Sequence, residues 1–202
     1  MIVAGHQADL LPWSGFWFTM AKADHFDVMI SDQFQPTGYH RRVLMRGTWA
    51  SVPVVPCGAG TLIGDVRIDP VAAPRALADL VRARYRSSRN WEVRGPRILE
   101  MLHDVRTEHL WQLNLSLILG VRDLLEIRTP VTVSEGTGGA RTSAGTGPDP
   151  EDTGVHIDVD VDVDVSRHQA MTGDSILTLL MDFDDPMELV LAERDEHAEI
   201  RA

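Results

Sequence analysis

The stretch MIVAGHQADLLPWSGFWFTMAKADHFDVMI, residues 1–30, decides the fold of this chain. Residues 1–6 form a short, mostly apolar run that predicts a buried strand. Residues 16–23 predict a short helix, and residues 25–30 predict a second strand. The order strand, loop, helix, strand favours a parallel βαβ unit. We therefore expect an α/β protein with a small, mostly parallel sheet and flanking helices, followed by a helical segment.

The same patterns predict a second set of elements between residues 31 and 134. Residues 31–48 predict a polar loop, and Gly95-Pro96 is expected to break the chain. Strand-forming runs lie at 50–55, 61–68 and 131–134. Apolar residues recur at helical spacing within 74–85, 97–103 and 110–125. Together with the first unit, these segments predict an α/β core over residues 1–134.

The composition changes after this core. Residues 135–154 are rich in Gly, Thr, Ser and Pro, which is typical of a flexible linker or a long loop. Residues 155–202 predict an acidic strand-helix-strand segment. Its parts are a strand at 155–165, a helix at 175–182 with Asp174 as N-cap, and a strand at 187–191.

Strict alternation in the first of these strands places four carboxylates on one face, those of Asp158, Asp160, Asp162 and Asp164. Such a ladder could bind a divalent cation, although it lacks the Gly and terminal Glu of an EF-hand loop. A half-solvated edge strand, or a low-complexity insertion, explains it without a metal. No metal site is assigned.

Overall composition is that of an ordinary globular protein, with 44% hydrophobic and 24% charged residues among 202. No apolar run approaches the roughly 20 residues that span a bilayer, and no signal peptide is recognisable. Because Cys57 is the single cysteine, an intrachain disulfide is impossible. We expect a cytoplasmic protein without a membrane span.

Charge is distributed unevenly along the chain. Residues 1–132 hold 15 basic and 13 acidic side chains, whereas residues 133–202 hold 4 and 17. This balance argues against nucleic-acid binding. A local basic run is either an attractor for an anionic ligand or a solvated helix face. The run consists of Arg75, Arg82, Arg84, Arg86, Arg89, Arg94 and Arg97.

Polar residues follow the first predicted strand. His6, at its end and facing a helix N-terminus, suits acid/base catalysis or phosphate binding. Gln7 could orient a ligand, and Asp9 could pair with His6 and fix its tautomer. Trp13 would provide an aromatic wall. The alternative is that His6 is a structural hydrogen-bonding residue.

A second polar cluster follows the second predicted strand. If the two strands are parallel, both clusters lie at the same edge of the sheet. Asp32 could act as a base or bind a ribose, and His40 could be a second acid/base group. Arg41 and Arg42 could hold a phosphate or carboxylate, with Gln33 beside the substrate. A solvated loop is the alternative interpretation of this cluster.

Other positions carry weaker indications. Cys57 is interpreted as structural, because no spacing supports a Cys-His pair. Asn114, on an apolar helix, is predicted to be a buried hydrogen-bonding residue. No Gly-rich dinucleotide motif, P-loop, nucleophile elbow or zinc spacing is present, so the sequence identifies no cofactor.

These residues resemble the WbqC-like protein family. HQADLLPWSGF at 6–16 is similar to the family pattern H-Q-P-N-[FY]-L-P-W-x-G-F. Weaker similarities cover 23–24, 31–34, 39–43, 49–54, 110–114 and 127–131. Departures include Ala8 and Asp9 in place of Pro-Asn and Ser31 in place of an acidic residue. The family's C-terminal L-S-G segment is missing.

The resemblance implies a cytoplasmic protein that serves surface-polysaccharide or specialised-metabolite assembly, with activated sugars or acyl donors as ligands. We expect a group transferase acting on a nucleotide-activated or phosphorylated, anionic small molecule. His6 would be its acid/base group, supported by Asp32, and Arg41 and Arg42 would hold the anion. The alternative is a non-catalytic scaffold that docks a partner enzyme through its acidic C-terminal third.

Overall fold

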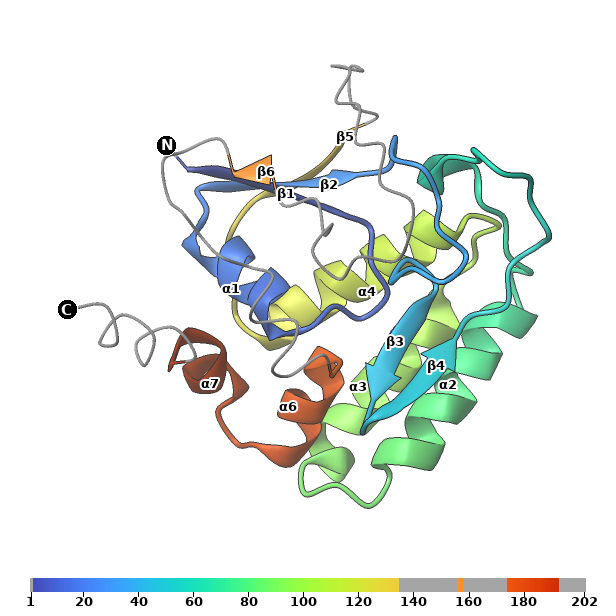
Figure 1. Ribbon diagram of the computed structural model, residues 1–202. Coiled ribbons are helices and arrows are strands. Elements are labelled where there is room, and N and C mark those ends of the chain that lie inside the picture. Colours follow the sequence, from blue (N-terminus) through green and yellow to red (C-terminus); the bar gives the residue numbers. More distant parts are fainter. Residues whose placement is uncertain (1, 135–155, 158–173, 193–202) are drawn as a thin grey trace.

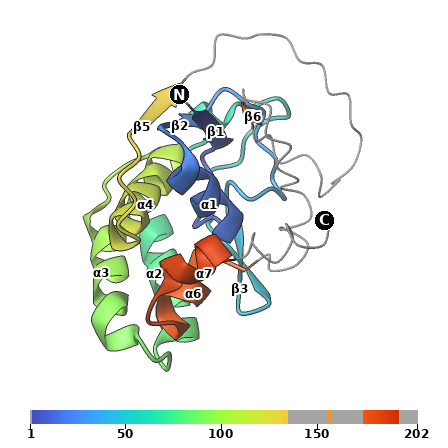
Figure 2. The same ribbon diagram turned by 90° about the vertical axis from the view of Figure 1, so that its left-hand side faces the viewer.

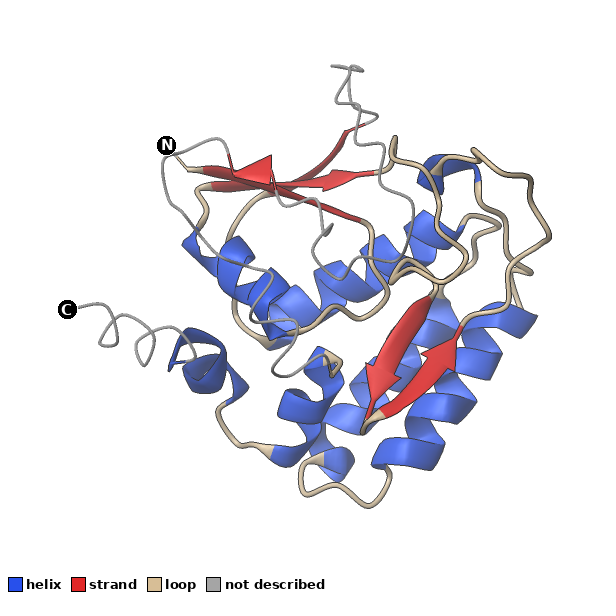
Figure 3. Ribbon diagram, in the orientation of Figure 1, coloured by secondary structure: helices blue, strands red, loops and turns tan. Residues whose placement is uncertain are grey.

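A computed structural model describes residues 2–134, 156–157 and 174–192 (Figure 1). A small sheet forms one layer, and the helices α1 (Ser14–Lys22) and α4 (Leu110–Leu124) lie against one of its faces (Figures 1 and 2). The remaining helices and a hairpin extend away from the sheet, as the secondary-structure colours show (Figure 3). The α/β prediction is confirmed.

Three parallel strands carry the sheet: β1 (Val3–Gln7), β2 (His25–Met29) and β5 (Val131–Ser134). The strand order is β5-β2-β1-β6, and the short β6 (His156–Ile157) pairs antiparallel with β1. β1, α1 and β2 form the predicted βαβ unit. Because β1 and β2 are parallel, both of the loops that follow them leave the same edge of the sheet.

A β-hairpin of β3 (Arg42–Met45) and β4 (Thr48–Ser51) occupies part of the predicted polar loop and the predicted strand at 50–55. Arg46 and Gly47, at its tip, both have positive φ, 50° and 69°. Two successive residues with positive φ give the tight turn that matches the twist of paired strands. The Arg-Gly pair was therefore an overlooked hairpin signal.

The described residues form four further α-helices. α2 spans Ala72–Tyr85 and α3 spans Trp91–Asp104, and the two pack against each other. α6 (Ile176–Asp182) contributes Ile176, Leu177, Leu180 and Met181 to the same hydrophobic core as the sheet. α7 (Pro186–Ala192) packs against α1.

Two strand predictions are wrong. The predicted strand at 61–68 contains instead a short 3-10 helix, Ile63–Asp65. Its Gly64 N–H donates to Ile30 O over 2.8 Å, which draws the segment tightly against the end of β2. The predicted terminal strand at 187–191 is helix α7, because Pro186 occupies its first position and Asp185 Oδ1 accepts a hydrogen bond from Glu188 N.

Two helix signals were also misread. Gly95-Pro96 does not break the chain, since both lie inside α3, whose Ile98 and Leu102 are buried in the core. The N-cap of α6 is Ser175, whose hydroxyl accepts from Leu177 N, and not Asp174. The predicted linker at 135–154 and the four-Asp ladder lie outside the described residues.

The packing of Tyr85 predicts a loss of stability in alkali. Burial raises the pKa of Tyr85 to about 12, and Asp174 and Asp182 act in the same direction. The unfolded phenol titrates near pH 10, so the contribution of Tyr85 is complete below pH 10 and is lost as pH rises to about 12. The free energy of unfolding, measured with urea, should fall between pH 9 and pH 11.5 in the parent protein. Tyr85→Phe should remove about 2 kcal/mol of this fall. Tyr39→Phe is the matched control, and an unchanged decline in Tyr85→Phe would contradict the expectation.

Candidate functional site

The two polar clusters meet at the carboxyl edge of the sheet. β1 ends at Gln7 and β2 at Met29, its partner in register. The Gln7 side-chain amide donates to Asp32 Oδ2 over 2.8 Å, so one side chain from each cluster forms a direct link. Both of these side chains are half-buried. The structure thus brings together two segments that lie 25 residues apart in the sequence.

A buried carboxylate lies between two histidines. Asp9 Oδ2 is 3.5 Å from His6 Nδ1, and Asp9 Oδ1 is 3.1 Å from His40 Nδ1. All three side chains are buried, with exposed fractions of 3% for His6, 4% for Asp9 and 3% for His40. The pairing of Asp9 with His6 follows the sequence prediction. The contact from His40 was not predicted, because it depends on how the second loop folds back.

The His6 ring is oriented by its other contacts. His6 Nδ1 also lies 3.2 Å from Gln7 O, and the ring meets Phe16 edge-on at a centroid distance of 5.1 Å. On the far side of the ring, His6 Nε2 is buried and has no hydrogen-bond partner among the described residues. Because Nδ1 faces the carboxylate, Nε2 is the ring nitrogen without a polar neighbour among the described residues.

The side chain of Asn114 connects the two loops. Its side chain is fully buried, and its Nδ2 donates to Ala8 O and to His40 O, each over 2.7 Å. Both N–H groups of the amide are used, one for each loop. The prediction of a buried hydrogen-bonding residue is confirmed, and its partners show that it fixes Asp9 and His40 relative to one another.

An aromatic pair lies on the outer side of the second loop. The guanidinium of Arg42 stacks over the ring of Trp49 at 4.3 Å, and the Tyr39 ring lies 5.6 Å from the same ring. Arg42 Nη1 also donates to Thr37 O. Trp49 is 44% exposed, which is unusual for so large a side chain. Trp49 was not predicted to belong to the site; the similarity of residues 49–54 to a family motif was the available signal.

The other predicted residues are placed differently. Trp13 is 3% exposed, and its ring lies where a Cβ on Gly15 would sit, 1.9 Å away, so it packs within the protein. Gln33 is exposed and forms a bridge with Leu62. Arg41 is half-buried, and its Nε makes no hydrogen bond to a described residue. Gln33 is therefore exposed to solvent, whereas the unpartnered Nε of Arg41 is buried.

Other features can be stated for the described residues alone. They contain no group of three or more His, Cys, Asp or Glu side chains arranged to hold a metal ion. None of their helices is both long enough and apolar enough to span a membrane. Cys57 is exposed. Two surface hollows, of ≈ 330 and ≈ 340 Å³, lie away from the carboxyl edge and include none of the predicted site residues.

Comparison with known proteins identifies the family of this chain. Residues 7–162 match the model of the WbqC-like protein family. The matched region contains both loops at the carboxyl edge, the β3-β4 hairpin and α4. No curated protein and no solved structure matches the chain.

Proposed function

The chain belongs to the WbqC-like protein family, and we propose that it is an enzyme, a group transferase that acts on a nucleotide-activated or phosphorylated small molecule. The observation that carries the proposal is the carboxylate of Asp9 between His6 and His40. A histidine oriented by a buried carboxylate is a common arrangement for moving protons in catalysis. The surface-polysaccharide or specialised-metabolite pathway and the cytoplasmic location belong to the same proposal.

The proposed roles follow from burial and hydrogen bonds. Asp32 is half-buried and held by Gln7, so it is the carboxylate that a substrate can reach. His6 exchanges a proton through Nε2, while Asp9 holds its Nδ1 side. In the transfer, an acceptor hydroxyl or amine forms the new bond to the transferred group. The bond between the transferred group and the phosphate oxygen breaks, and its electrons remain on that oxygen. The acceptor's proton passes to His6, the proposed base.

Binding of the anionic part is assigned to the second loop. Arg41 is half-buried, with a buried Nε that has no partner among the described residues, and guanidinium groups bind phosphate in a bidentate manner. Arg42 presents its charge beside the exposed ring of Trp49. A flat base or a sugar ring can stack against such a surface, so Trp49 and Tyr39 are proposed to contact the group attached to the phosphate.

Titration of the purified protein tests the proposal. The panel contains nucleotide sugars, free nucleotides and coenzyme A thioesters, and binding is measured by calorimetry. We expect one class to bind, with affinity reduced at least tenfold in Arg41→Gln; Asp32→Asn should abolish turnover with the acceptor. Exposed Arg97→Gln and Asp104→Asn are the matched controls. Absence of binding to every class, or binding that is unaffected by Arg41→Gln, His6→Ala and Asp32→Asn alike, would overturn the proposal.

The acidic C-terminal third supports the alternative, a scaffold that docks a basic partner enzyme. Deleting the third is a poor test, because α6 supplies fully buried Ile176, Leu177 and Leu180 to the core. Replacing Asp158, Asp160, Asp162 and Asp164 by Asn removes four charges and leaves α6 intact. A pull-down that is salt-sensitive in the parent protein and lost in this variant favours docking; an unchanged pull-down contradicts it.

A further inference from the structure

The structure divides the basic run on α2 and α3 into arginines with different surroundings. Arg84 donates to Met45 O, Thr48 O and Trp49 O, and so fastens the hairpin to α2. Arg94 donates to Leu180 O, Phe183 O and Asp184 O, each over 2.6 Å, and fastens the end of α6 to α3. These two guanidinium groups are used within the fold and are not available to a ligand.

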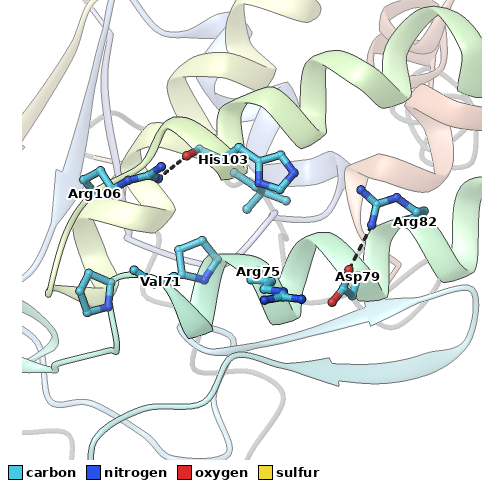
Figure 4. Close-up of a pocket in the computed structure, with 9 residues that line it drawn as sticks. Val71, Arg75, Asp79, Arg82, His103 and Arg106 are labelled. Atoms are coloured by element: carbon cyan, nitrogen blue, oxygen red, sulfur yellow. Dashed lines mark hydrogen bonds and ion pairs between the residues drawn. The ribbon is translucent and has the colours of Figure 1, made fainter.

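Other members of the run line a hollow of ≈ 330 Å³ between the start of α2 and the end of α3. In Figure 4, Arg75, Asp79 and Arg82 extend from α2, His103 from the facing α3, and Arg106 from the loop that follows it. Three guanidinium groups from two separate segments therefore surround a volume within the usual range for small-molecule sites.

The charges in this hollow are not neutralised internally. Asp79 pairs with Arg82 at 3.0 Å, which leaves Arg75 and Arg106 without a carboxylate partner among the described residues. Arg106 is held in place by donating through Nη1 to His103 O and to Val105 O, so the rest of its guanidinium is positioned in advance. The excess of two positive charges favours an anion with two negative charges.

The remaining surface of the hollow is apolar. Val71 is 65% exposed, the largest exposed fraction of any large aliphatic residue on α2 or at its start. Pro70 and Pro74 flank it, and the buried Leu102 provides the floor. A site that only received inorganic phosphate would not need this apolar wall, because phosphate offers nothing to bury against it.

We propose that this hollow is a second ligand site, which binds a small organic dianion such as a phosphomonoester. Arg75 and Arg106 contact the charged group, and Val71 with the two prolines contacts the carbon portion. The site is separate from the carboxyl edge of the sheet, since it shares no residue with the clusters that contain His6 and Asp32.

Phenyl phosphate is the probe, with inorganic phosphate and phenol as the two partial ligands, and binding is followed by ¹H–¹⁵N NMR. We expect saturable shifts on α2 and α3 with phenyl phosphate at millimolar concentrations, and at least fivefold weaker binding of either partial ligand. Arg75→Gln should weaken phenyl phosphate binding about tenfold, the value of one lost charge-assisted contact. Arg86→Gln, an exposed arginine at the opposite end of α2, is the matched control.

Any of the following results would overturn the proposal: no saturable shift up to about 10 mM probe, an affinity for inorganic phosphate equal to that for phenyl phosphate, or equal losses in Arg75→Gln and Arg86→Gln. Val71→Ser, at an exposed position, separates the apolar contact from the charge. It should weaken the binding of phenyl phosphate and leave the binding of inorganic phosphate unchanged.

Arg41→Gln distinguishes this site from the proposed transferase site. Loss of phenyl phosphate binding in Arg41→Gln, with Arg75→Gln unaffected, would place the probe at the carboxyl edge and contradict the second site.

Discussion

Replacing Asn114 by leucine is expected to lower the free energy of unfolding by about 4 kcal/mol. The substitution keeps the size of the side chain but removes two hydrogen bonds of 2.7 Å. Ala8 O and His40 O are then left buried without their donor, and each unsatisfied group costs about 1–3 kcal/mol. The loss should exceed that of most core substitutions because both loops lose their common anchor.

Urea denaturation followed by circular dichroism measures this effect. Ser116→Ala is the control on the same helix, since Ser116 is only half-buried and makes no side-chain hydrogen bond within the described part of the chain. Its free energy of unfolding should stay within about 0.5 kcal/mol of the parent value. A change below about 1 kcal/mol in Asn114→Leu would mean that the two loops are held together by other contacts.

Replacing Asp9 by alanine is expected to lower the free energy of unfolding by about 3 kcal/mol and to disturb both histidines at once. Its carboxylate is the shared neighbour of His6 Nδ1 and His40 Nδ1, at 3.5 and 3.1 Å. Without it, His40 Nδ1 loses its polar neighbour and His6 Nδ1 keeps only Gln7 O. Asp9→Asn keeps the shape and one acceptor oxygen, so about half of the loss should be recovered.

The tautomers of the two histidines give a second measurement. They would not change if Asp9 had a purely structural role. ¹⁵N NMR should show changed ring-nitrogen shifts for His6 and His40 together in Asp9→Ala. The exposed Asp65→Ala is the control. A variant in which only one histidine responds would contradict the arrangement of one carboxylate between two rings.

Much of the sheet could be predicted from local patterns. The βαβ unit follows from apolar runs and a short helix within the first 30 residues, and its parallel pairing places Gln7 and Asp32 at one edge. The pairing of Asp9 with His6 is also local, because the two residues are three positions apart. Asn114 was identifiable as a buried amide on an otherwise apolar helix face.

The remaining features depend on contacts between distant segments. His40 reaches Asp9 because the second loop folds onto the first, where Leu10 N donates to Tyr39 O and Asn114 donates to both loops. Gly95-Pro96 was expected to break the chain, yet α3 runs through both residues because its buried face and the three carbonyls bound by Arg94 stabilise it. Such long-range compensation leaves no periodic signal in the sequence.

A local signal was nevertheless overlooked at the start of α7. Asp185-Pro186-Met187-Glu188 combines an N-cap aspartate with proline at the first helical position, which indicates a helix start and not a strand. The short apolar run that follows was ambiguous, since Met187 and Val190 fit either period over so few residues. Tertiary packing decides it, because Val190 is fully buried in α7.

The central claim is that the carboxyl edge of the sheet, between Asp32 and Arg41, is where this protein binds its substrate. A crystal structure of the protein soaked with the tightest-binding member of the nucleotide panel tests this claim most directly. We predict ligand density within hydrogen-bond distance of Asp32 and Arg41, with the attached ring against Trp49. Density only at another surface, such as the hollow between α2 and α3, with the carboxyl edge unoccupied, would contradict the claim.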